Sequence, residues 1–229
     1  MDFSQAATLA ADPLKAQGFR TQRAESPEDL WQPLYDRVNY AAAGATQLAF
    51  FSTPQGQNAT LITGIGAAAA KVKDYRDTNM MNSNVVPTKM FKFMGISLAY
   101  INQIPGTVGS GVAPAVGVAS DAADRDRVRN NAWFNFTIVD KRIIDLPLVC
   151  IPEVNPLTVA STTVTNATIL GSAGGGGANV PMYKLPIPIT LNPYENFSVT
   201  INLSAAVALS GANSMDIYVI MQGFMRRPT

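Results

Sequence analysis

The chain has 229 residues and a formal net charge of +1, and 47% of its residues are hydrophobic while 14% are charged. This length and hydrophobic content can bury a sizeable core, and they favour one larger all-β domain over two small ones. The nearly neutral charge excludes a general attraction to nucleic acid or anionic membrane, because that attraction needs a basic patch or stripe.

The residue types also exclude several kinds of catalysis. The chain has no histidine and a single cysteine, Cys150. It therefore lacks the residues for Ser-His-Asp and Cys-His nucleophiles, the usual zinc sets and an internal disulfide. Cys150 lies in an apolar run, which predicts an inert buried thiol. No motif pairs acidic residues at a defined spacing, so an enzyme is the weakest functional class.

The first residues lack the basic and then apolar pattern of a signal peptide. No apolar run approaches the roughly 20 residues that a membrane-spanning helix needs. We therefore expect the protein to be made and kept in a reducing compartment, or to leave it only by lysis.

Residues 1–43 differ from the rest of the chain and predict an N-terminal arm. A serine N-cap, a proline at the first helical position and an acid in the first turn predict a short helix through Leu30, Trp31 and Leu34. The basic residues of the arm are matched or exceeded by acidic ones, which argues against direct genome packaging. Two placements stay open: an arm that lies on a neighbouring subunit, and a tail packed on its own domain.

Two glycine-rich segments imitate nucleotide-binding motifs. The segment 61–69 leads from an apolar run into Gly-x-Gly-x-x-Ala, but Asn82, Asn84 and Val85 stand where the ribose-binding acid is needed. The glycine run 171–177 lacks the Gly-Lys-Ser/Thr ending of a phosphate-binding loop. We therefore expect no bound cofactor.

The middle of the chain alternates between β patterns and irregular segments. Within residues 90–103 the apolar alternation changes phase at Met94-Gly95, which predicts a β-bulge. Residues 105–120 are uncharged and rich in small residues, and they predict a long apolar loop that contacts another subunit. Residues 121–129 predict a solvated linker, with a helical turn that carries inter-subunit ion pairs as the alternative.

The C-terminal third carries the strongest β pattern. Residues 197–204 alternate strictly between apolar and polar, which is typical of a half-buried strand. Prolines at every second position of residues 185–189 predict an edge strand, because proline cannot donate to a central ladder. With the alternating residues 216–221, these segments predict an antiparallel run of three strands over residues 183–228.

Together the β patterns predict eight or nine strands, near residues 46–53, 58–64, 90–103, 132–140, 142–151, 157–170, 183–191, 196–208 and 215–226. That number, with long irregular connections, predicts an all-β fold: an antiparallel two-sheet sandwich of jelly-roll type over residues 44–229, with an extended N-terminal arm.

Several segments resemble jelly-roll structural proteins of bacteriophage particles. They are Trp133–Ile138 followed by Asp140–Arg142, Leu185–Ile189, the closing segment Gly223–Pro228, and Asp77–Met80 ahead of Pro87 and the Phe91 strand. The resemblance implies a coat, cement or decoration protein with an N-terminal arm, located in the virion and made in the host cytoplasm. Its partners would be copies of itself and other capsid proteins.

The expected mechanism is assembly through apolar loops and arms that neighbouring subunits cover. A charged fraction below the roughly 25% of typical soluble domains agrees with a surface that is partly covered. The expected inter-subunit contacts are apolar or charged residues outside the predicted strands: Phe3, Phe19, Arg20, Arg23, Trp31, Val112, Pro114, Val116, Arg226 and Arg227.

The alternative is a receptor- or carbohydrate-binding β module on a phage particle. Such a module would use exposed aromatic residues at loop tips, and the candidates are Tyr35, Tyr40, Tyr183 and Tyr194.

Overall fold

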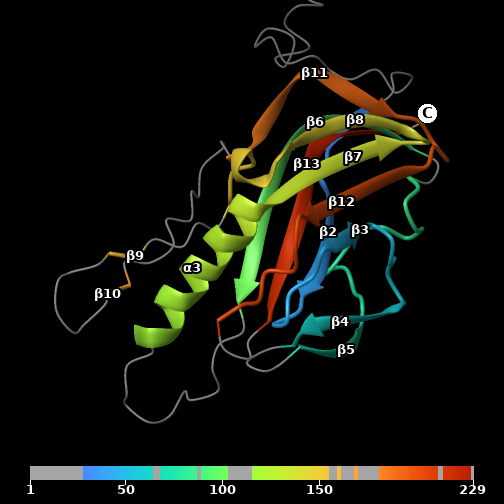
Figure 1. Ribbon diagram of the computed structural model, residues 1–229. Helices are drawn as coiled ribbons and strands as arrows, with labels where there is room; N and C mark the ends of the chain where they lie inside the picture. Colours follow the sequence, from blue (N-terminus) through green and yellow to red (C-terminus); the bar gives the residue numbers. More distant parts are fainter. Residues whose placement is uncertain are drawn as a thin grey trace, which may run out of the picture.

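The computed structural model describes residues 28–63, 68–86, 89–102, 115–154, 159–160, 168–169, 181–210 and 214–227. Two antiparallel sheets that pack face to face form the body of the described structure (Figure 1). The first sheet has the order β1-β13-β6-β11, with β2 also paired to β13. Its strands are β1 (Glu28–Trp31), β2 (Leu34–Tyr40), β6 (Met90–Asn102), β11 (Tyr183–Leu191) and β13 (Met215–Arg227).

The second sheet has the order β3-β12-β7-β8. Its strands are β3 (Gln47–Phe50), β7 (Ala132–Ile138), β8 (Lys141–Pro147) and β12 (Phe197–Leu203). Two small hairpins form separate two-stranded sheets: β4 (Asn58–Ile62) pairs with β5 (Ala68–Val72), and β9 (Val159–Ala160) pairs with β10 (Thr168–Ile169). The helix α3 (Ala115–Asn131) leads directly into β7, at the end of the sandwich away from the C-terminus (Figure 1).

Eight strands make the jelly roll when β1 and the two small hairpins are set aside. In chain order these eight strands are β2, β3, β6, β7, β8, β11, β12 and β13. One sheet has the order β2-β13-β6-β11, which is first, eighth, third and sixth in the chain. The other has the order β3-β12-β7-β8, which is second, seventh, fourth and fifth. This order confirms the predicted antiparallel two-sheet sandwich of jelly-roll type.

The predicted run of three paired C-terminal strands is wrong. β11 pairs with β6, β12 pairs with β3 and β7, and β13 pairs with β1, β2 and β6. In this jelly roll the three C-terminal strands alternate between the two layers, and period-two alternation does not say which layer a strand joins.

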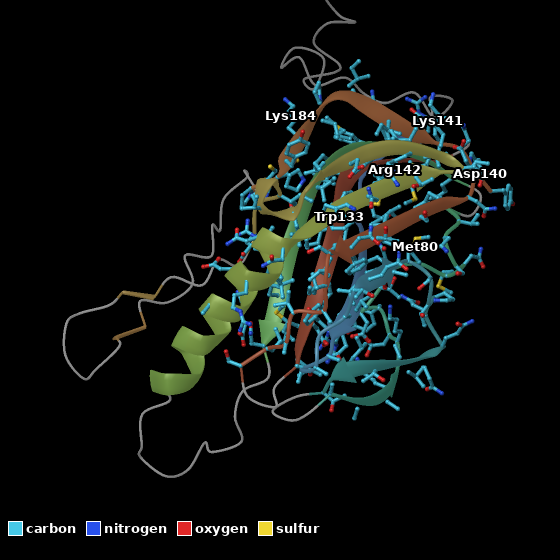
Figure 2. The ribbon with its side chains drawn as sticks, in the orientation of Figure 1. Met80, Trp133, Asp140, Lys141, Arg142 and Lys184 are labelled. Carbon is cyan, nitrogen blue, oxygen red and sulfur yellow. The ribbon has the colours of Figure 1, made fainter. Side chains whose placement is uncertain are left out.

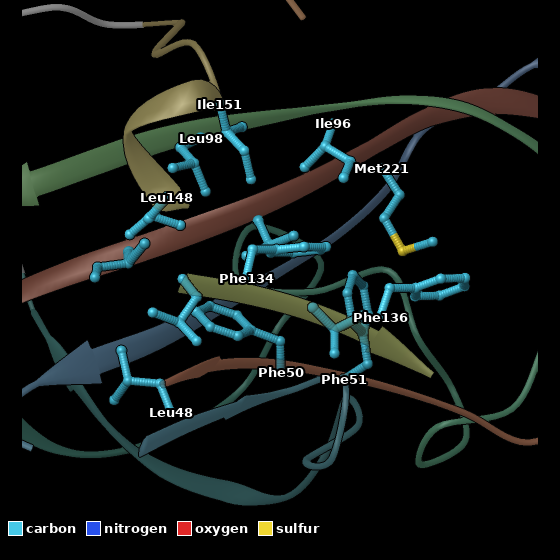
Figure 3. Close-up of a cluster of buried hydrophobic side chains, with 14 of the residues drawn as sticks. Leu48, Phe50, Phe51, Ile96, Leu98, Phe134, Phe136, Leu148, Ile151 and Met221 are labelled. Carbon is cyan, nitrogen blue, oxygen red and sulfur yellow. The ribbon is translucent and has the colours of Figure 1, made fainter. Parts of the chain in front are cut away.

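Aromatic rings join the two sheets in the core (Figure 3). The ring of Phe93 on β6 lies 5.3 Å from that of Phe136 on β7, measured between centroids. Phe136 continues the contact to Phe197 at 6.1 Å, and Phe197 to Phe51 at 5.5 Å. All four side chains are buried, so this chain of tilted rings fixes how the two layers face each other.

The two local irregularities predicted from the sequence are confirmed. The register of β6 against β13 shifts from Gly95 to Phe93, which leaves Met94 as the extra residue of a β-bulge. β11 lies at the edge of its sheet and pairs with β6 alone, and its register shifts between Lys184 and Ile189, around the prolines.

The short helix predicted through Leu30, Trp31 and Leu34 is wrong, because these residues lie in β1 and β2. Both strands pair with β13, which is distant in sequence, and the pairing buries Leu34 in the core. Long-range pairing and burial therefore outweigh the local capping signal. Residues 28–40 of the predicted arm contribute strands to the sandwich, and residues 1–27 lie outside the described residues.

The long loop predicted for residues 105–120 is wrong from Ala115 onward, and so is the solvated linker predicted for residues 121–129, because both segments belong to α3. The helix has no strong apolar stripe that the sequence could have revealed. Its polar anchors instead join residues far apart in the chain: Asp124 to Ser210, Arg125 to Asn102, and Arg129 to Glu153.

The buried thiol predicted at Cys150 is wrong, because this side chain is exposed. Cys150 ends the 3-10 turn η1 (Leu148–Cys150), in which Leu148 is the buried residue. Successive residues of so tight a turn point in different directions, so an apolar run does not keep all of its members inside.

Gly223 lies opposite the bulge of β6, where a Cβ atom would meet the backbone oxygen of Lys92 at 2.3 Å. The replacement Gly223→Ala is expected to lower the free energy of unfolding by about 3 kcal/mol, because the strands must move apart. Chemical denaturation followed by circular dichroism measures this loss.

Gly56→Ala is the matched control, since a Cβ atom there would meet nothing within 4 Å. Its φ of +83° is left-handed, so it should cost only about 1 kcal/mol of backbone strain. Equal losses in the two variants would contradict the close approach of β13 to β6.

Candidate functional site

The outer face of the first sheet carries an exposed surface that crosses four strands. Trp31 on β1 faces Phe224 on β13, Phe224 faces Lys92 on β6, and Lys92 faces Thr190 on β11. In the next row, Asp29 faces Arg226 and Arg226 faces Met90. We call these seven residues the Trp31 surface.

An aromatic pair of exposed Trp31 and half-buried Phe224 forms one side of the Trp31 surface. The indole of Trp31 stands edge-on to the Phe224 ring, with centroids 5.0 Å apart and an interplanar angle of 83°. Trp31 nevertheless stays 51% exposed, although a large apolar side chain gains free energy when it leaves water. An indole fixed in position and exposed to solvent is typical of a residue that anchors a protein contact.

A charged pair forms the other side. Arg226 Nε donates to Asp29 Oδ1 at 2.8 Å, and Nη2 donates to Oδ2 at 3.0 Å. These hydrogen bonds hold the pKa of the Asp29 carboxyl below its ordinary value, so the pair stays ionised at neutral pH. The two-bond geometry leaves Arg226 in a fixed orientation.

A small pocket lies between the two sides, with a volume of about 140 Å³. Its lining combines charged, polar and apolar residues: Asp29, Met90, Lys92, Thr190, Phe224 and Arg226. Pockets for small-molecule ligands are usually about 300–1,000 Å³, so this pocket is better suited to a single side chain of another polypeptide.

The tip of the sandwich beside this surface has strained backbone. Among the described residues, those other than glycine with left-handed φ are Phe51, Asn84, Val139 and Tyr194. Backbone hydrogen bonds join their loops: Asn84 N–H donates to Phe51 O at 2.8 Å, and Phe197 N–H donates to Asn84 O at 3.0 Å.

Val139 and Tyr194 are the exposed members of this tip. Their φ angles are 52° and 64°, a conformation that is a genuine outlier for a β-branched residue such as valine. Both side chains project into solvent, with exposed fractions of 63% and 69%. Tyr194 lies three residues after Leu191, the last residue of β11, and Thr190 of the Trp31 surface is next to Leu191. The tip and the Trp31 surface therefore lie at the same end of the molecule, which Asp140 and Lys141 mark in Figure 2.

A network of buried charges holds β2 in place. Arg37 Nε donates to Asp216 Oδ2 at 2.7 Å and Nη1 donates to Asp77 Oδ1 at 3.1 Å, while Nη2 donates to the backbone oxygen of Ile62 at 2.6 Å. The backbone N–H of Ile62 in turn donates to Asp216 Oδ2 at 2.8 Å. The guanidinium therefore ties β2 to β13 and clamps the β4-β5 hairpin onto them.

A second buried pair supports the same strand. Lys73 Nζ donates to Asp36 Oδ1 at 2.7 Å, and the backbone N–H of Phe51 donates to Asp36 Oδ2 at 2.7 Å. Burial raises the pKa of Asp36 above its ordinary value, and Lys73 opposes that rise. These partners are internal to the chain, so the charges serve the scaffold and not an open site.

The structure brings together two of the predicted contact residues, Trp31 and Arg226, on the Trp31 surface. Arg227 is the last residue of β13 and pairs with Glu28. Val116 lies in α3, and its side chain lies outside the described part of the chain. The remaining predicted contacts also lie outside the described residues: Phe3, Phe19, Arg20, Arg23, Val112 and Pro114.

The aromatic residues considered for ligand binding separate in the structure. Tyr40 is buried in the core, Tyr35 and Tyr183 are half-buried, and Tyr194 is exposed at the tip. Sequence reasoning missed the five residues that complete the Trp31 surface: Asp29, Met90, Lys92, Thr190 and Phe224. The alternation of residues 90–93 and 223–226 could have placed Lys92 and Phe224 on an outer face, but not beside Trp31.

No family model matches the chain, and no curated protein matches it. None of the helices in the described segments is long and apolar enough to cross a membrane. The same segments contain no group of three or more Cys, Asp or Glu residues that could hold a metal ion.

Replacing Arg37 should expose the role of the buried network. Arg37→Met leaves Asp216 buried without its cation and leaves Asp77 with Lys71 as its remaining cation, so the free energy of unfolding should fall by about 3–5 kcal/mol. Urea denaturation measures the loss.

Arg142→Met is the matched control, because it breaks an exposed pair with Asp145 and should change stability by less than about 1 kcal/mol. Similar losses in the free energy of unfolding from the two substitutions would contradict the role of Arg37 in holding β2, β13 and the β4-β5 hairpin together.

Proposed function

We propose that this protein is a structural protein of a virus particle, of the bacteriophage kind, which self-associates to build or reinforce a capsid. The observation that supports the proposal most is the Trp31 surface, where an indole held against Phe224 stays half exposed beside a paired Asp29 and Arg226. Tryptophan and arginine are the residues most enriched at the energetic centres of protein interfaces.

The fold and composition support the same function. Jelly rolls include viral capsid domains and lectins, and a fold alone does not choose between them. The low charged fraction of 14% and the exposed apolar side chains at the tip favour a protein whose surface is covered by neighbours. We propose other copies of this chain and other capsid proteins as those neighbours.

The N-terminal residues supply a candidate for the covering segment. Glu28 begins β1 at the edge of the Trp31 surface, and 27 residues precede it, among them Phe3 and Phe19. The pocket volume of about 140 Å³ suits one such side chain from a neighbouring copy. Exchange of arms between copies would join subunits without any movement of the rigid sandwich.

Trp31→Ala should weaken self-association by about 2 kcal/mol, roughly 30-fold in the dissociation constant, because it removes the central anchor of the contact. Sedimentation velocity over a concentration series measures the change, and negative-stain imaging shows whether particles form.

Val149→Ala is the matched control, since Val149 is also an exposed apolar residue but lies in η1, outside the Trp31 surface. Its association should match that of the wild type. A Trp31→Ala protein that assembles as well as the wild type would rule out the Trp31 surface as the contact.

Deletion of residues 1–27 tests the arm separately. Because β1 begins at Glu28, this truncation keeps every strand found among the described residues, and the thermal unfolding temperature should stay close to that of the full chain. Light scattering should show smaller assemblies or none. Particles of normal size from the truncated chain would contradict arm exchange, whatever the result for Trp31→Ala.

A further inference from the structure

The pocket of the Trp31 surface holds one cation that no described residue neutralises. Three charged side chains line the pocket, and two of them, Asp29 and Arg226, pair with each other. The third, Lys92, is exposed on β6 and makes no ion pair with any residue that the structure describes. Two cations and one carboxylate leave an excess of one positive charge, so the pocket favours an occupant that carries a carboxylate.

The rest of the lining favours an aromatic ring beside that carboxylate. The pocket volume of about 140 Å³ is close to the roughly 150 Å³ of a cavity that holds benzene, so one phenyl ring fits. Phe224 offers this ring an aromatic wall, and its centroid lies 5.0 Å from that of Trp31. A guanidinium attracts the face of an aromatic ring, and Arg226 lines the pocket in an orientation that its two hydrogen bonds to Asp29 fix.

The charged side chains of the N-terminal arm are segregated by sign. Residues 1–14 carry acidic side chains and no basic one, while residues 15–23 carry basic side chains and no acidic one. Phe3 follows Asp2, whereas Phe19 is followed by an arginine. Of these two phenylalanines, only Phe3 therefore brings the negative charge that the pocket favours, because the arginine after Phe19 would be repelled.

The length of the arm also distinguishes the two phenylalanines. Glu28 begins β1, and the next residue, Asp29, already lines the pocket, so the arm leaves the sandwich beside the pocket of its own copy. A folded domain of 229 residues is roughly 45 Å across, which is about the distance to the same pocket on an adjacent copy. Phe3 is 25 residues before Glu28 and can span up to about 80 Å, whereas Phe19 is 9 residues before it and spans at most about 30 Å. Only Phe3 is far enough from β1 to reach that pocket.

We propose that Asp2 and Phe3 of a neighbouring copy occupy this pocket. The phenyl ring enters the pocket, and the Asp2 carboxylate pairs with Lys92, whose long flexible side chain can follow it. The pairing selects this segment over the basic residues 15–23, because a basic side chain would meet the like charge of Lys92. This assignment rests on the proposed self-association and names the segment that fills the contact.

An exchange of charges in the full chain tests the assignment. Lys92→Glu and Asp2→Lys should each weaken self-association by roughly threefold to tenfold, because each places like charges together. The double variant Lys92→Glu/Asp2→Lys should return the dissociation constant to within about threefold of the wild type, since opposite charges again face each other. Sedimentation velocity over a concentration series measures all three variants. A folding defect cannot produce this pattern, because the second substitution would not repair it.

Two further variants serve as controls. Phe3→Ala should weaken the association by roughly tenfold, and Phe19→Ala should match the wild type. Lys141→Glu is the charge control, because Lys141 is exposed on β8 of the other sheet (Figure 2), so it should not restore the association of Asp2→Lys.

The assignment is overturned if the double variant associates no better than the single variants, if Lys141→Glu restores association as well as Lys92→Glu, or if Phe3→Ala matches the wild type. Any of these results beside a weakened Trp31→Ala protein keeps the Trp31 surface as the contact and removes only Asp2 and Phe3 as its occupant. Unchanged association in Trp31→Ala and in all of these variants overturns the assembly contact as well.

Discussion

The buried guanidinium of Arg37 is the interaction on which the arrangement of the N-terminal strands depends. It bonds at once to β13 through Asp216, to the segment after the β4-β5 hairpin through Asp77, and to the hairpin itself through the backbone of Ile62. Removing these charges from water is unfavourable, and the cost is offset only while every partner stays in place. The network therefore fixes the register of β2 against β13. Because β1 ends three residues before β2 begins, the same placement brings β1 beside the C-terminal end of β13.

This placement makes β13 the strand that organises both the core and the surface. The inward residues of β13 fill the space between the sheets. On its outer face, Asp216 near the start of the strand bonds to Arg37, and Phe224 and Arg226 near its end belong to the Trp31 surface. The bulge at Met94 and the absent side chain of Gly223 let β6 follow β13 along its whole length. A rigid sheet beneath Trp31 keeps the indole preformed, so a partner that covers it would lose little conformational entropy in ordering this surface.

The Trp31 surface lies on the outer face of the first sheet, away from the core. The Trp31 surface combines an aromatic pair, a fixed ion pair and a pocket with room for one side chain, which suits a polypeptide.

The sequence by itself determined the features that depend on neighbouring residues. Alternation and proline spacing were enough to predict the two-layered β fold, the bulge at Met94 and the edge position of β11, because pleat geometry and the missing proline donor act locally. Trp31 and Arg226 were singled out because they are apolar or charged residues outside the predicted strands. Only the tertiary structure decided that β1 and β2 are strands, that residues 115–131 are helical, and that Trp31 meets Phe224 while Arg226 meets Asp29. Those outcomes depend on partners up to 197 positions away in the chain. A local sequence pattern cannot predict them, because the stabilising free energy appears only when the distant segments pair.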